Sequence, residues 1–150
     1  MNTDKIQDML RSANEFLVIS SNNKTFIPNF VNMAFACELY LKAILQQKTG
    51  SYPRGHDLES LYNKVIANIN EIDFLMILGE EIGKGFIDIK VSTNVTMAKY
   101  QLQQMLNRHK NLFEDWRYIF ENPPEKPYSV DGTLRAFAEA LKRYSESLID

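Results

Sequence analysis

The chain has few of the residues that mark secreted, metal-bound or membrane-embedded proteins. It contains one cysteine, Cys37, and two histidines, so it can form no internal disulfide and has no CxxC pair for zinc. No run approaches the ~18 consecutive apolar residues of a membrane-spanning helix. The first residues lack the basic and apolar segments of a secretion signal. We therefore expect a cytoplasmic protein with no membrane segment, no cofactor and no metal site.

An excess of charge of one sign is also lacking. Lysine and arginine number 17 against 19 acidic residues, which gives a formal net charge of -2. No overall positive field attracts nucleic acid, so any basic cleft must be local. The apolar fraction of 45% in 150 residues is ample for one hydrophobic core. We expect a single domain spanning residues 1–150.

Apolar residues recur at helical spacing through most of the chain. The pattern predicts helices after Thr3, from near Pro28 to before Gly50, after Asp57, over residues 71–83, over about residues 93–121, and after Asp131 as a cap. Residues 86–91 alternate apolar and polar, but they lack a partner strand and favour an extended connection. The predicted fold class is all-α, an up-and-down bundle of about five to six helices.

The long segment over residues 93–121 carries an apolar line at near-heptad spacing. Its members are Val95, Ala98, Leu102, Met105, His109, Leu112, Trp116 and Ile119. Such a line favours packing along another helix nearly in parallel. We interpret His109 as a core residue, because no second histidine stands at metal-binding spacing.

Polar residues next to these stripes are candidates for a site. Glu38 and Lys42 are four residues apart in the order that supports a helix. Glu38 also lies beside an apolar stripe, where a carboxylate is costly unless it is paired, so we expect an arginine or histidine partner on a facing helix. Asp57 is predicted to cap a helix, and His56 either fixes the loop or serves as a general base or phosphate contact.

Arg117 is the sharpest candidate for a ligand contact. It lies in the last turns of the long predicted helix, where its planar guanidinium can bind phosphate or carboxylate. The simpler interpretation is an ion pair with Glu38, Glu114 or Glu121. Tyr118 beside it either stacks on a base or belongs to the core.

Three segments, in this order, resemble landmarks of the HEPN family (higher eukaryotes and prokaryotes nucleotide-binding). They are ACELYLKA at residues 36–43, GHDL at residues 55–58 and WRYIFEN at residues 116–122. The resemblance implies a bundle of antiparallel helices that often dimerises about a two-fold axis. Many members are metal-independent ribonucleases.

The resemblance departs from the nuclease pattern at its histidine. Nuclease members carry R-x(4–6)-H, with the arginine and histidine of two subunits converging on the scissile phosphate. Arg117 occupies the arginine position, and Asn122 follows after a four-residue spacer where the histidine is expected. Asparagine can hold a hydrogen bond, but it cannot carry a proton near neutral pH. The resemblance thus implies a degenerate motif.

The leading hypothesis is a HEPN-like homodimeric module that binds RNA, a nucleotide or a partner protein and is non-catalytic or weakly catalytic. Its ligand-binding residues would be Glu38, Lys42, Arg117, Tyr118 and Asn122. The resemblance implies a defence or toxin–antitoxin setting, or a nucleotidyltransferase-like protein as partner.

Two alternatives stay open, and with them the question of whether the protein is an enzyme. In the first, the protein is a metal-independent ribonuclease in which Arg117 binds the phosphate and His56 is the acid or base. In the second, it is a structural interaction protein whose line from Val95 to Ile119 forms the dimer contact.

Overall fold

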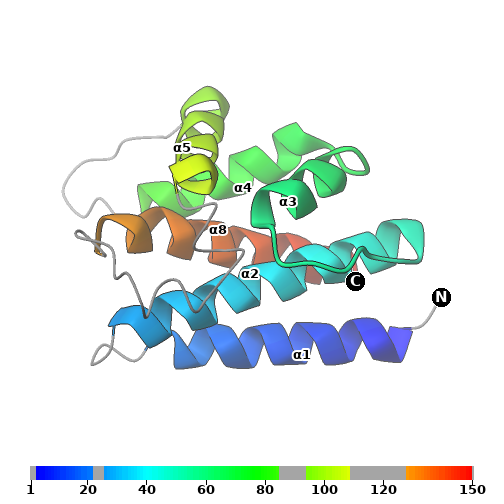
Figure 1. Cartoon of the computed structure of the whole chain (residues 1–150). Coiled ribbons are helices and arrows are strands. Elements are labelled where there is room, and N and C mark those ends of the chain that lie inside the picture. The colour runs from blue at the N-terminus through cyan, green and yellow to red at the C-terminus, as the bar shows by residue number, and fades with distance from the viewer. Residues whose placement is uncertain (1–2, 22–25, 85–93, 109–127, 150) are drawn as a thin grey trace.

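The computed structural model describes residues 3–21, 26–84, 94–108 and 128–149, and these residues form six helices and no strand. The helices are α1 (Thr3–Ile19), α2 (Phe26–Thr49), α3 (Leu58–Ile66), α4 (Glu71–Gly83), α5 (Val95–Arg108) and α8 (Tyr128–Ser147). Figure 1 shows them packed as a bundle in which α1 and α2 lie side by side. The predicted all-α fold class is confirmed.

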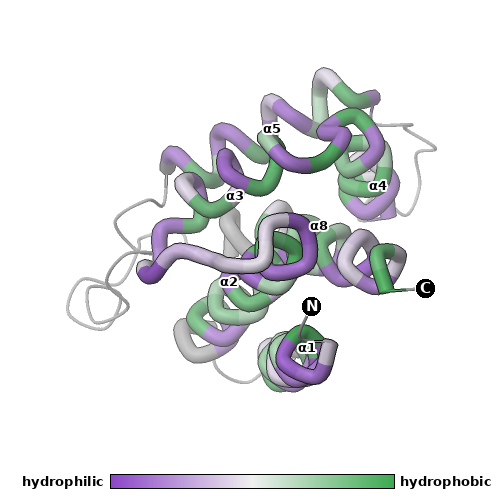
Figure 2. The backbone as a smooth tube through the Cα atoms, turned by 90° about the vertical axis from the view of Figure 1, so that its right-hand side faces the viewer, coloured by the Kyte–Doolittle hydropathy of each residue, from purple (hydrophilic) through white to green (hydrophobic). Residues whose placement is uncertain are grey.

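Helix α2 is the centre of the bundle. Helices α1, α3 and α8 all pack against it, and Figure 2 shows α2 between α1 and the remaining helices. Residues on several sides of α2 are fully buried, including Met33, Tyr40, Leu41 and Ile44. Burial on several sides follows because three helices cover α2 from different directions.

Aromatic side chains join α3 and α4 to α8. The rings of Tyr62 on α3, Phe74 on α4, and Phe137 and Tyr144 on α8 form edge-on or tilted contacts with centroids 5.8 to 6.1 Å apart. This is the geometry that aromatic quadrupoles prefer. Burial also raises the pKa of the Tyr62 hydroxyl. The cluster fixes α3 and α4 against the face of α8.

The predicted apolar line of α5 packs against other helices of the same chain. Ala98, Leu102 and Met105 are buried, and the helix contacts α3, α4 and α8. Figures 1 and 2 show α5 crossing α4, so the expectation of nearly parallel packing is wrong, because three helices share the stripe. This part of the line cannot form a dimer contact. The continuation from His109 to Ile119 lies outside the described residues.

Helix ends agree with most of the local signals in the sequence. Asp57 caps α3 as predicted, because its Oδ1 accepts hydrogen bonds from the backbone N–H groups of Glu59 at 3.1 Å and Ser60 at 3.3 Å. Helix α8 begins at Tyr128, so Asp131 lies inside it and the predicted cap is wrong. Residues 86–91, expected to be extended, lie outside the described residues. Within the described ranges, no helix is long and apolar enough to cross a membrane.

Candidate functional site

A nearly buried carboxylate on α2 holds two cationic or titratable partners. Glu38 Oε1 lies 2.8 Å from His56 Nδ1, and Glu38 Oε2 lies 3.1 Å from Lys42 Nζ. The side chains of Glu38 and Lys42 are only 12% and 10% exposed. Each carboxylate oxygen therefore has a partner, which offsets the cost of burying the charge. We call Glu38, Lys42 and His56 the Glu38 cluster.

The chain builds this cluster from one helix and one loop. Glu38 and Lys42 stand one turn apart on α2, so their side chains share a face. Gly50 ends α2 with a φ of 83°, a left-handed conformation that favours glycine. Gly55, with a φ of 121°, then turns the chain immediately before His56. The cap at Asp57 fixes the far end of the loop, so His56 is held at both sides.

The imidazole of His56 is oriented by its carboxylate partner. An ionised carboxylate only accepts hydrogen bonds, so Nδ1 carries the hydrogen in the contact with Glu38. The His56 side chain is 62% exposed. In the neutral ring, Nε2 is then a lone-pair acceptor, and in the protonated ring it is a donor to an anion. The arrangement can therefore bind a phosphate oxygen or accept a proton.

Lys42 and an aromatic ring extend the cluster toward α1. The Nζ of Lys42 lies 5.7 Å from the ring centroid of Tyr52, and the Nζ of Lys5 on α1 lies 4.9 Å from the same centroid. Both distances are within the range of cation–π attraction. Lys5 and Tyr52 were not predicted from the sequence. An aromatic residue in a loop rich in glycine and proline, between two family landmarks, is the signal that could have identified Tyr52.

The structure brings together three of the residues singled out from the sequence. Glu38, Lys42 and His56 form one cluster. Glu38 has a histidine partner as expected, but His56 lies in the loop before α3 and not on a facing helix. Arg117, Tyr118 and Asn122, together with His109, lie outside the described residues. The possible pair between Arg117 and Glu38 therefore stays a prediction.

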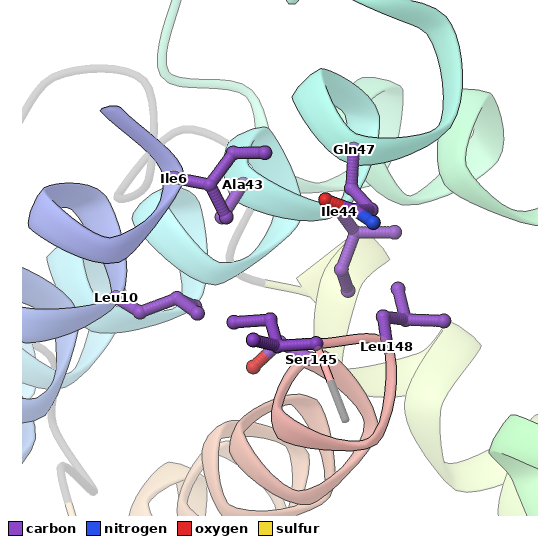
Figure 3. A pocket seen from close by; sticks show the side chains of 8 residues that line it. Ile6, Leu10, Ala43, Ile44, Gln47, Ser145 and Leu148 are labelled. Atoms are coloured by element: carbon purple, nitrogen blue, oxygen red, sulfur yellow. The ribbon is translucent and has the colours of Figure 1, made fainter. Parts of the chain in front are cut away.

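Other features of the described residues offer less chemistry. Burial raises the pKa of the Cys37 thiol, which disfavours a reactive thiolate. No three histidine, cysteine or acidic side chains in the described ranges gather closely enough to hold a metal ion. A shallow hollow lies between α1, α2 and the end of α8, and the polar side chains that line it are those of Gln47 and Ser145 (Figure 3). It encloses a cavity volume of about 0 Å³, whereas ligand pockets usually measure about 300–1,000 Å³, so it offers no room for a ligand.

The landmarks, the fold and the cluster agree with a comparison against protein families. The model of the HEPN domain matches residues 6–121. This match covers more than half of the chain, and the chain belongs to the HEPN family. HEPN domains are associated with binding of nucleotides or RNA and with ribonuclease activity. No curated protein and no solved structure matches the chain.

Proposed function

We propose that this HEPN domain binds single-stranded RNA or a nucleotide at the Glu38 cluster, with His56 and Arg117 contacting phosphate. The observation that carries the proposal is the 2.8 Å contact between Glu38 Oε1 and His56 Nδ1 on an exposed ring. It directs Nε2 away from the bond to Glu38, where the ring can meet an anion. Arg117, and with it Tyr118 and Asn122, is assigned from the family landmark alone.

The local charges are compatible with an anionic ligand in spite of the net charge of -2. Two cationic or titratable residues, Arg54 and His56, lie in the loop between α2 and α3. Two more, Lys5 and Lys42, lie over the ring of Tyr52 in that loop. Glu38 is bonded to Lys42 and His56. Tyr52 adds an aromatic ring beside these cations. Cations that follow a backbone and aromatic rings that stack on bases are the two elements of single-strand binding.

RNA binding tests this proposal directly. Fluorescence anisotropy with a labelled single-stranded RNA in EDTA would compare the wild-type protein with the His56→Ala and Arg117→Ala variants. We expect each substitution to weaken binding about tenfold, which corresponds to ~1.4 kcal/mol. Lys84→Ala is the matched control, because it removes an exposed cation at the C-cap of α4 that pairs with Glu81.

The control separates a site from a general charge effect. Wild-type affinity in the Lys84→Ala variant, together with weakened binding in the other two, supports the site. Equal losses in all three variants mean that only net charge matters, and unchanged binding in the His56→Ala and Arg117→Ala variants removes the site.

A second candidate function is a metal-independent ribonuclease, and the bond between Glu38 and His56 favours it. A carboxylate that orients an imidazole is the arrangement by which a base is held ready for proton transfer. His56 Nε2 would take the proton from a 2'-hydroxyl, whose oxygen attacks the adjacent phosphorus while the bond to the 5'-oxygen breaks. The leaving 5'-oxygen takes a proton from water, a 2',3'-cyclic phosphate and a 5'-hydroxyl result, and His56 returns its proton to the solvent. Arg117 would stabilise the phosphate charge.

A cleavage assay in EDTA distinguishes the two functions. If the protein is a nuclease, His56→Ala should lower the cleavage rate by a factor of about 10² or more, the usual contribution of general acid–base catalysis. Arg117→Ala should abolish cleavage as well. RNA that is bound and stays intact at high protein concentration excludes the nuclease and leaves the binding function in place.

The wider setting is proposed from family membership alone. We propose that the protein is cytoplasmic, forms a homodimer, and acts in defence or in a toxin–antitoxin pair with a nucleotidyltransferase-like protein. Affinity purification of the tagged chain from its host, followed by mass spectrometry, should recover a protein of that class. Recovery of the chain with no such partner would contradict this setting without affecting the RNA site.

A further inference from the structure

Two lysines from different helices lie over the ring of Tyr52, and they differ in their exposure to solvent. Lys42 on α2 is nearly buried, and its Nζ also lies 3.1 Å from Glu38 Oε2, so this lysine is held in place. Lys5 on α1 is exposed, and its Nζ lies 4.9 Å from the ring centroid. Tyr52 itself is half-buried and packs against the hydrophobic core. The ring is therefore fixed by the protein, whereas the exposed lysine over it has a long, flexible stem.

The ring belongs to the same group of contacts as His56, the proposed phosphate contact. Lys42 lies over Tyr52 and bonds to Glu38, and Glu38 Oε1 in turn lies 2.8 Å from His56 Nδ1. Tyr52 and His56 also belong to the one short loop between α2 and α3. A nucleotide whose phosphate meets His56 therefore has an aromatic ring close to its base.

We propose that Tyr52 is the platform on which an unpaired base of the ligand stacks, and that the base takes the place of Lys5 over the ring. This assignment rests on the proposed function, and it names what the site recognises besides phosphate, which is a base with a free face. Every base has a face that can stack, so the platform tolerates different sequences. A base inside a duplex is already stacked on its neighbours, so the site discriminates against it.

The strengths of the two contacts favour the displacement of Lys5 by a base. The attraction of an exposed lysine to an aromatic ring is weaker than the stacking of a base on such a ring. The ammonium of Lys5 keeps its charge when it leaves the ring, and a phosphate oxygen of the ligand can accept its hydrogen bond. A cationic ligand, which aromatic rings also bind, is a poorer occupant, because Lys5 and Lys42 repel it.

A cycle of protein and ligand variants isolates the stacking contact. Fluorescence anisotropy at low salt in EDTA would measure how the wild-type protein and Tyr52→Leu bind labelled oligoadenylate and an abasic oligomer with the same number of phosphates. We expect Tyr52→Leu to weaken the binding of oligoadenylate about tenfold and to leave the abasic oligomer unchanged, because only oligoadenylate has bases to stack. Tyr52→Phe is the matched control and should bind oligoadenylate as the wild type does, because it keeps the ring.

Unlabelled competitors distinguish the two possible sources of the base, a free nucleotide and RNA. Adenosine monophosphate and ribose phosphate would compete with labelled oligoadenylate for the wild-type protein and for Tyr52→Leu. If Tyr52→Leu weakens the binding of the mononucleotide but not that of ribose phosphate, the ligand class includes free nucleotides. If Tyr52→Leu affects only the oligomer, the base belongs to RNA. Either result supports the platform.

The abasic oligomer also shows whether the loop is intact in the Tyr52→Leu variant. An equal loss of affinity for both oligomers overturns the platform, because it means that Tyr52 only supports the loop and the Glu38 cluster. An unchanged affinity of Tyr52→Leu for oligoadenylate also overturns the platform, and it leaves the phosphate contact at His56 standing. A wild-type protein that binds neither oligomer overturns the proposed function together with the platform.

Discussion

Two ionic clusters in this molecule share one plan and differ in one chemical property. In each, a nearly buried carboxylate holds two partners: Glu38 bonds to Lys42 and His56, and Glu81 bonds to Lys84 at 2.9 Å and Arg143 at 3.4 Å. We call Glu81, Lys84 and Arg143 the Glu81 cluster. Only the Glu38 cluster contains an imidazole, the side chain that exchanges a proton in the physiological pH range.

The cations of the two clusters also differ in solvation. Lys42 is buried, whereas Lys84 and Arg143 are 68% and 41% exposed. Hydrogen bonding to Glu80 raises the pKa of Arg143 further, so its charge is fixed. The Glu81 cluster thus joins α4 to α8 without changing state. The Glu38 cluster has an exposed imidazole ring, which is why we propose an RNA contact for this cluster and not for the Glu81 cluster.

The largest effect should come from Glu38→Gln. Lys42 would stay buried without a counter-charge, and we expect a loss of about 3 kcal/mol in the free energy of unfolding. Urea denaturation measures this loss. The double variant Glu38→Gln, Lys42→Met should recover much of it, because no buried charge is then unpaired. A loss smaller than that of Glu81→Gln would break the distinction between the clusters.

A smaller effect is expected from Gly55→Ala. The φ of 121° is unfavourable for a residue with a side chain, although nothing lies within 4 Å of the added Cβ. We expect a loss of about 2 kcal/mol from backbone strain and weaker RNA binding, because the residue precedes His56. Urea denaturation and the anisotropy assay measure the two effects. Unchanged stability together with unchanged RNA binding would show that the loop does not depend on this turn.

Glu81→Gln should cost about 1 kcal/mol in urea denaturation. Its partners Lys84 and Arg143 are exposed enough to be hydrated when the carboxylate is lost. RNA binding should remain at the wild-type level. A reduced affinity would show that the Glu81 cluster takes part in the site, and would contradict the assignment of function to the Glu38 cluster alone.

The smallest change in stability should follow His56→Ala, with a loss below ~1 kcal/mol because the ring is largely exposed. Arg143→Ala is the matched comparison and should cost a similar amount. The two variants should differ in RNA binding, which falls only in His56→Ala. Thermal denaturation and anisotropy on the same samples would show whether stability and binding separate as expected.

Much of the candidate site was visible in the sequence, but its geometry was not. The order of the landmarks identified Glu38, Lys42 and His56, and the apolar surroundings of Glu38 required a partner. The pairing of Glu38 with His56 joins residues that are 18 positions apart, and no local rule selects it. Tyr52 was not predicted, because its role as a cation–π partner depends on two lysines from different helices.

The sequence by itself determined what depends on neighbours within a few residues. Helical periodicity and the cap at Asp57 are set by hydrogen bonds and side-chain spacing over one or two turns. At Asp131, the same kind of local signal failed because α8 begins earlier, at Tyr128.

Only the tertiary structure decided which helix is central, which face of α5 is exposed and which cations meet Glu38. These outcomes depend on how several helices divide one core among them. The same apolar spacing is found on helix faces that lie in a core and on faces that lie in an interface. Only the packing of the helices therefore decides which residues are buried. The physical reason is that periodicity fixes the face of a helix, and only packing fixes what lies against it.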